Sequence, residues 1–178
     1  MGVRVVVASN RTGRINGVDV EHLSAYIESV AADESRADRD PVVVARWLGG
    51  TRAEVVSAGG SPVYMGGDDD PSAMGMLLRT LAACDVEVVA NKAALLGVEI
   101  VELSIEVSGH FNVKRYLGLE SNNGPGYERV AYRVRLRTKD ATDEQIAEIM
   151  RACENGSPVA DTLRRSVRVE AAFDITHA

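Results

Sequence analysis

The side chains of this sequence with the clearest nucleophilic potential are its two cysteines, Cys84 and Cys153. A thiolate attacks electrophiles, whereas a thiol in apolar surroundings behaves as a small hydrophobic residue. Both cysteines lie in apolar stretches, so an inert structural role is the default interpretation for each. Two cysteines are also too few for a disulfide-based scaffold. From the residues alone, a reactive Cys84 and an inert Cys84 remain open alternatives.

Other site chemistry has little support in the residue pattern. The glycine pairs lack the lysine that a phosphate-binding loop requires, and no serine lies in a nucleophile elbow. These pairs are Gly49-Gly50, Gly59-Gly60 and Gly66-Gly67. The histidines at 22, 110 and 177 are far apart, and three aspartates at 68–70 are more typical of residues that precede a helix than of a cation site. We therefore expect neither a metal nor a cofactor.

A row of arginines at alternate positions, Arg133, Arg135 and Arg137, could indicate a polyanion site. An earlier stretch with the same alternation carries Glu102 and Glu106 on its polar side. Charged residues of opposite sign pair across neighbouring strands. We therefore predict cross-strand ion pairs in place of a binding site.

The composition excludes some partners. The chain has 178 residues, a charged fraction of 26% and a net charge of −6, which argues against nucleic acid as a partner. The first eight residues contain Arg4 and are too short for the core of a signal peptide. We therefore expect a cytoplasmic protein that does not contact a membrane, with both cysteines reduced at rest.

Cys84 lies in the middle of a long predicted helix between Pro71 and Gly97. Asp70 is suited to cap its first turn, Pro71 to occupy the first helical position, and Gly97 to end it in the left-handed conformation. The helix is apolar almost all round but too interrupted by polar residues to span a membrane. Such a helix is covered on several sides, so elements of this chain or of a second chain must surround it.

The other predicted elements place strands before and after this helix. Upstream we expect a strand at Arg4–Ala8, a helix from Val20 to Val30 capped by Asp19, and a charged connector from Ala32 to Asp40. Three short strands follow, at 42–48, 52–57 and 62–65, with a hairpin turn at Gly49-Gly50.

Downstream, two strands with strict alternation turn Val101, Leu103, Ile105 and Val107, and then Val130, Tyr132, Val134 and Leu136, toward the core. Thr142 and Gln145 form a capping box for a helix that buries Cys153. Ser157-Pro158-Val159 turns the chain, and a last strand covers 167–173. Strands in which apolar and polar residues alternate have one solvent-exposed face. The predicted class is therefore α+β, with antiparallel sheets covered by helices on one face.

Several of these segments together resemble one family. LLRTLAAC (77–84), SPVADTL (157–163), ARWLGGTRAEV (45–55), YLGL (116–119) and GPGY (124–127) resemble the OsmC/Ohr family in order and spacing. NGVDVEHLSAYIESV (16–30) resembles the extra helix of an OsmC-like subgroup. The resemblance implies an OsmC-like domain at 41–178, preceded by an N-terminal appendage and linker at 1–40. It also implies an intertwined homodimer, in which antiparallel sheets wrap around two central helices.

The resemblance further implies a function in peroxide defence. Active members of this family are thiol-dependent peroxidases that reduce organic hydroperoxides. The cysteine at the position of Cys84 becomes a sulfenic acid, and a second cysteine in a CPV-type turn condenses with it to a disulfide. A glutamate in the first turn of the helix and an arginine orient the thiolate.

This sequence departs from the family pattern at two positions. Ser157 occupies the position of the second cysteine and cannot form a disulfide, and Gly75 stands at or beside the position of the glutamate. The thiolate-activating arginine has three candidates, which are Arg46, Arg52 and Arg79.

The departures leave two functions open. The first is a one-cysteine peroxidase in which Cys84 attacks a small apolar hydroperoxide and an external thiol reduces it, with Cys153 as a weaker alternative resolving residue. The alternative is a non-catalytic OsmC-like homodimer that binds a small apolar ligand. The retained cysteine within the matching motif favours the enzyme.

Overall fold

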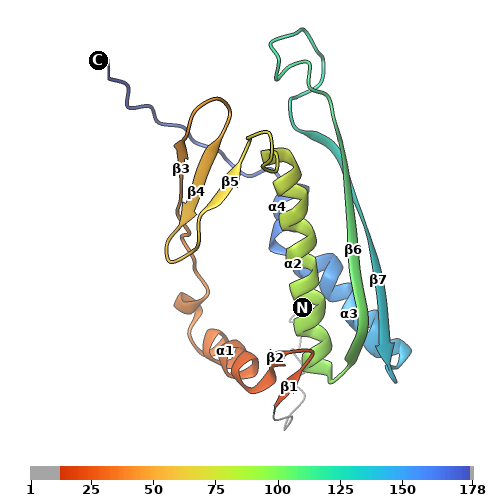
Figure 1. The fold of residues 1–178 in the computed structure, drawn as a ribbon. Coiled ribbons are helices and arrows are strands. Elements are labelled where there is room, and N and C mark those ends of the chain that lie inside the picture. Colours follow the sequence, from red (N-terminus) through yellow and green to blue (C-terminus); the bar gives the residue numbers. More distant parts are fainter. Residues whose placement is uncertain (1–12, 177–178) are drawn as a thin grey trace.

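The computed structural model describes residues 13–176, and within them the chain forms an α+β fold with antiparallel sheets (Figure 1). This confirms the predicted class. The predicted strand at Arg4–Ala8 lies outside the described residues. The elements are β1 (Arg14–Ile15), β2 (Val18–Asp19), α1 (Val20–Ala32), a 3₁₀ turn η1 (Glu34–Arg36), β3 (Val43–Trp47), β4 (Ala53–Ser57), β5 (Val63–Met65), α2 (Ala73–Leu96), β6 (Glu99–Phe111), β7 (Tyr127–Lys139), α3 (Asp143–Gly156) and α4 (Pro158–Arg164).

Helix α2 is the long central helix, and its start differs from the prediction. The N-cap is Ser72, whose hydroxyl accepts a hydrogen bond from the Gly75 amide at 3.0 Å. Asp70 does not cap the helix, because its carboxylate accepts a hydrogen bond from Arg52 at 2.7 Å. The helix ends as predicted at Gly97, which adopts φ 70° in the left-handed region.

The β6–β7 hairpin packs its apolar face on α2 and α3. The core at this contact consists of Val89, Ala93, Val98, Ile149 and Cys153. The exposed face carries the predicted cross-strand pairs, with Arg135 at 3.2 Å from Glu106 and Arg137 at 3.1 Å from Glu102.

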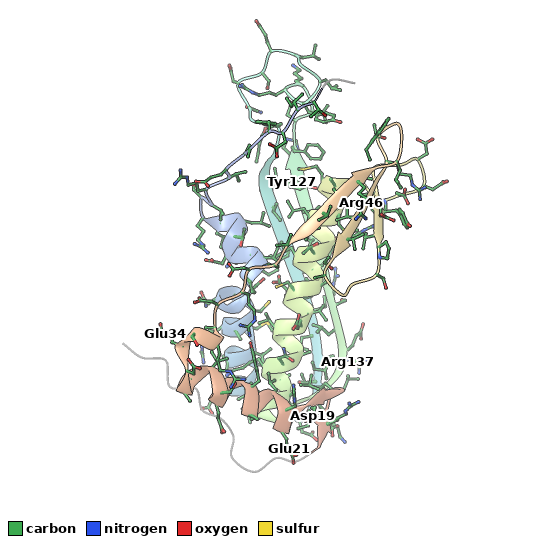
Figure 2. The ribbon with its side chains drawn as sticks, turned by 90° about the vertical axis from the view of Figure 1, so that its left-hand side faces the viewer. Asp19, Glu21, Glu34, Arg46, Tyr127 and Arg137 are labelled. Carbon is green, nitrogen blue, oxygen red and sulfur yellow. The ribbon has the colours of Figure 1, made fainter. Side chains whose placement is uncertain are left out.

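One inward position of β6 was predicted wrongly. A bulge between Ile100 and Glu102 leaves Val101 51% exposed, while Ile100 packs against the core. An extra residue in one strand shifts the alternation by one position at that point. At the far end of the hairpin, Tyr127 donates a hydrogen bond to the Met74 carbonyl at 2.9 Å and fixes the strand on the start of α2 (Figure 2).

The sheet β3–β4–β5 lies on the other side of α2 from the β6–β7 hairpin (Figure 1). Its hairpin turn is at Gly49-Gly50, as the sequence predicts, with Val43 opposite Ser57 and Trp47 opposite Ala53. Every residue of β3 is exposed, and Trp47 is 77% exposed. This sheet therefore presents apolar side chains that the described residues of one chain do not cover.

The last part of the chain differs most from the prediction. Ser157 begins a further helix, α4, where a turn and a short segment were expected. The predicted strand at 167–173 is wrong for this single chain, because residues 166–176 have no strand partner among the described residues. Val169 is 91% exposed and Phe173 is 80% exposed. An alternating apolar pattern predicts a strand, but a strand also requires a free sheet edge that lies within reach.

The N-terminal appendage is attached through Asn16. Its side-chain amide donates to the Val98 carbonyl at 2.8 Å and accepts from the Ile100 amide at 2.8 Å. Helix α1 is capped by Asp19 as predicted, through a 3.0 Å hydrogen bond from the His22 amide. Figure 2 shows Asp19 and Glu21 near the end of the molecule where Arg137 lies. Over the part of the chain that the structure describes, no helix is both long and apolar enough to cross a bilayer.

Candidate functional site

Cys84 lies in the middle of α2, half-buried, and its sulfur faces the junction between α3 and α4. Ser157 occupies that junction, where it ends α3 and caps α4. Its hydroxyl donates a hydrogen bond to Cys84 Sγ over 3.4 Å. Residues 73 positions apart in the chain are therefore in direct contact. Cys84 and Ser157, two of the residues that the sequence pointed to, therefore lie together at one site.

Ser157 is held firmly at this site. Ser157 is 1% exposed, and its Oγ accepts a hydrogen bond from the Ala160 amide at 3.2 Å. Pro158 follows it at the first helical position, which favours the start of a helix. The sequence S-P-V-A therefore favours a helix that begins after Ser157, because serine is a preferred N-cap residue.

Cys153 lies one turn before Ser157 on α3 but in different surroundings. It is 2% exposed and belongs to the apolar core with Val89 and Ile149. Burial, followed by the negative charge of Asp85, raises the pKa of the Cys153 thiol to about 11. The thiol therefore keeps its proton near neutral pH, which is the property of an inert structural cysteine.

Asp85 is the most unusual residue near the two cysteines. It is 0% exposed, and neither carboxylate oxygen has a hydrogen-bond partner in the structure. Buried carboxylates ordinarily have partners, since an unpaired buried polar group costs about 1–3 kcal/mol or more. Tyr132 lies close enough to feel the Asp85 charge. The pKa of its phenol is raised by burial, then by the neighbouring Cys153, and also by Asp85.

In the sequence, Asp85 is one of the polar residues that interrupt the apolar surface of the long helix. Leu81 and Val89, four residues before and after it, are both buried. Residues four apart lie on the same face of a helix, so this spacing could have placed Asp85 on the buried face.

The candidate arginines contact other partners. Arg46 on β3 pairs with Glu54 at 3.2 Å, on the sheet β3–β4–β5 (Figure 2). The hydrogen bond and charge of Asp70 raise the pKa of the Arg52 guanidinium, which also lies 4.8 Å from the Tyr64 ring centre. Arg79 is exposed on α2. Within residues 13–176, no arginine hydrogen-bonds to Cys84.

The first turn of α2 has no carboxylate. Gly75 occupies the position discussed above, and a β-carbon added to it would lie 3.0 Å from Ser72 Oγ. A side chain at this position would therefore crowd the hydroxyl that caps the helix.

A cavity of about 200 Å³ is lined by residues of α2, β7 and α4, and its lining includes neither Cys84 nor Ser157. Leu81, one turn before Cys84, and Ala160, which binds Ser157, both line it. Its polar lining residues include Glu128, Arg129, Tyr132 and Arg164. The Arg164 guanidinium donates a hydrogen bond to the Tyr132 hydroxyl at 3.3 Å. Tyr132 was expected only as an inward residue of its strand, and Arg164 was not among the expected site residues. Among the described residues, no cluster of three or more His, Cys, Asp or Glu side chains is suited to hold a metal ion.

Comparison with known proteins identifies relatives of this chain. Residues 66–172, more than half of the chain, match the family described as OsmC-like protein. The structure is similar to that of an OsmC-like protein from Mycoplasma pneumoniae, with TM-score 0.60 and 15% identity over 71% of this chain and 89% of that chain. It is also similar to an OsmC-like protein of unknown function from Vibrio cholerae, with TM-score 0.58 and 10% identity over 70% and 94% of the two chains.

An organic hydroperoxide resistance protein from Elizabethkingia anophelis has TM-score 0.50 and 12% identity, over 71% of this chain and 89% of that chain. None of the curated proteins matches the sequence. At these identities the structural likeness establishes the fold.

Proposed function

Because this chain belongs to the OsmC-like protein family, we propose that it reduces organic hydroperoxides at Cys84. The observation that supports this proposal is the 3.4 Å contact between Ser157 Oγ and Cys84 Sγ. It brings together the two positions at which active members of the family carry their reacting cysteines. The related fold of the Elizabethkingia organic hydroperoxide resistance protein agrees with this class of activity.

In the proposed reaction, the Cys84 thiolate attacks the terminal oxygen of the hydroperoxide. The sulfur–oxygen bond forms as the oxygen–oxygen bond breaks, and the departing alkoxide takes up a proton to leave as an alcohol. Sulfur is oxidised to the sulfenic acid and the peroxide is reduced. The cavity beside Leu81 and Tyr132 is the proposed binding site for the carbon chain of the substrate.

The return to the thiol uses an external dithiol. Its first thiol attacks the Cys84 sulfenic acid, which releases water and leaves a mixed disulfide. Its second thiol then breaks that disulfide, frees Cys84 and leaves the reductant oxidised. Ser157 has no sulfur, and Cys153 keeps its proton because burial raises its pKa to about 11. The proposed cycle therefore uses one cysteine of this chain.

The proposal includes a homodimer. The support for it is the uncovered apolar surface on β3 and on the C-terminal segment, where Trp47 is 77% and Phe173 is 80% exposed. A second copy would cover both surfaces and would offer the sheet edge that residues 167–173 lack. Sedimentation equilibrium checks this part of the proposal, and a monomer at micromolar concentration would contradict it.

A second candidate function, binding of a small apolar ligand without chemistry, has two observations in its favour. No arginine of residues 13–176 hydrogen-bonds to Cys84, and the next residue is a buried acid, Asp85. A thiolate benefits from a nearby cation and is disfavoured by a nearby anion. This candidate predicts a Cys84 that is slow to react with thiol reagents.

Peroxide consumption distinguishes the two functions. The assay follows loss of cumene hydroperoxide with a dithiol reductant, in the wild type and in Cys84→Ser. The enzyme proposal expects turnover by the wild type and a loss of at least about a hundredfold in the variant, because the nucleophile is removed. Cys153→Ser is the matched control and is expected to keep turnover within about threefold. Equal rates for the wild type and Cys84→Ser would overturn the enzyme proposal.

A further inference from the structure

We propose that Ser157 is a positioning residue that donates a hydrogen bond to the Cys84 sulfur and thereby favours its thiolate. This inference rests on the proposed function, because it assigns a role within the same site. It gives the serine a function of its own, beyond the absence of a second cysteine.

The Ser157 hydroxyl can donate one hydrogen bond and accept others. Its oxygen already accepts the Ala160 amide hydrogen at 3.2 Å, since Ser157 caps α4. That contact uses a lone pair and leaves the hydroxyl proton free. Among the described residues, the acceptor within reach of this proton is Cys84 Sγ at 3.4 Å.

Burial excludes water as a competing acceptor for the Ser157 hydroxyl proton. Ser157 is 1% exposed, so bulk water does not offer its hydroxyl another acceptor. The backbone that carries the hydroxyl is fixed on both sides, because Ser157 ends α3 and begins α4. The donor is therefore aimed at the sulfur before any substrate binds, which makes it preorganised.

A hydrogen bond to the charged form of an acid favours that form. The gain is larger for a charged acceptor than for a neutral one, so the Ser157 donor stabilises the thiolate more than the thiol. This matters at Cys84, because Arg46 and Arg52 are paired with Glu54 and Asp70, and no arginine of residues 13–176 hydrogen-bonds to the Cys84 sulfur. The serine would supply part of the stabilisation that a cation supplies in other thiol sites.

The test compares two variants of Ser157 in a Cys153→Ala background, so that Cys84 is the thiol that reacts. Ser157→Ala removes both the hydroxyl donor and the helix cap. Ser157→Gly removes the hydroxyl but keeps a residue that is accepted at N-caps at a cost of only a few tenths of a kcal/mol. The measurement is the pH profile of Cys84 alkylation by iodoacetamide, read by intact-protein mass spectrometry.

We expect both variants to shift the alkylation profile toward higher pH, so that Cys84 reacts about tenfold more slowly at pH 7. Tenfold is the order expected for the loss of one hydrogen bond to a charged group. Thr142→Ala is the matched control, because it removes the cap of the neighbouring helix α3 without touching Cys84. Its profile should match that of the Cys153→Ala parent.

A folded Ser157→Gly protein with the parent's profile would overturn the inference. So would a Thr142→Ala profile that shifts as much as those of the Ser157 variants, since the effect would then come from the loss of a cap. Alkylation involves no hydroperoxide. If the Ser157 variants show the expected shifts but the wild type does not consume hydroperoxide, the proposed function is overturned and the role of the Ser157 hydrogen bond stands.

Discussion

The surroundings of Cys84 and of Cys153 differ although both thiols lie near the α3–α4 junction. Cys84 is half-buried and faces a hydroxyl donor, the side chain of Ser157. Cys153 is 2% exposed, packs in the apolar core and lies near the unpaired carboxylate of Asp85. The comparison teaches that the group facing the sulfur, more than the helix that carries it, decides what a cysteine can do.

The largest expected difference between the two thiols is in their reactivity. Burial, followed by the Asp85 charge, raises the pKa of Cys153 from 9.0 to about 11, which lowers its own thiolate fraction at pH 7.5 by about a hundredfold. We therefore expect iodoacetamide to label Cys84 at least about a hundredfold faster than Cys153 in the native protein. Peptide mass spectrometry after timed labelling measures both rates, and equal labelling would break the comparison.

The stability of the protein should depend on pH through Cys153. Its pKa is raised in the folded state from 9.0 to about 11, so the native state keeps a proton that the unfolded state loses in this range. The contribution is fully present below about pH 9 and is lost as the pH rises toward 11, by about 2–3 kcal/mol in total.

Urea unfolding at pH 8 and pH 10.5, in the wild type and in Cys153→Ala, measures this loss. The difference between the two proteins isolates the thiol from the tyrosines and lysines that also titrate there. The wild type should lose more stability than Cys153→Ala over this pH range, and an equal loss would contradict the assignment.

A smaller effect should follow from Asp85→Asn. Asp85 is the second cause of the raised Cys153 pKa, after burial, so removal of its charge should lower that pKa part of the way. We expect Cys153 alkylation at pH 9 to rise about three- to tenfold. Glu154→Gln removes the next contributing charge and is the matched control, with a smaller rise expected. No change in Asp85→Asn would show that burial alone sets the Cys153 pKa.

Local signals in the sequence predicted most of the fold. The Gly97 stop, the Asp19 cap, the Thr142–Gln145 capping box and the Gly49-Gly50 turn each depend on residues a few positions apart, and the structure confirms all four. The errors came from competition between parts that are distant in the chain. Asp70 was free to cap α2 by sequence, but Arg52 binds it instead. The predicted strand at 167–173 has the right pattern but pairs with no strand among the described residues.

The candidate site was only partly predictable. The resemblance to a family directed attention to Cys84 and Ser157, and the contact between them depends on how α2 packs against the α3–α4 junction. The roles of Cys84, Cys153, Arg46 and Arg52 stay predictions. Asp85 was missed because a helix that is apolar all round offers several faces, and its sequence alone does not say which one this chain covers.

The attachment of the N-terminal appendage has a consequence for aggregation. Within residues 13–176, strand β6 pairs with β7 alone, so its other edge offers unpaired backbone groups to a strand of a different molecule. Asn16 presents an acceptor and a donor to Ile100 and Val98, as a neighbouring strand would. One amide side chain thus blocks the beginning of that edge. The appendage therefore also protects the β6–β7 hairpin from edge-to-edge association at the start of β6.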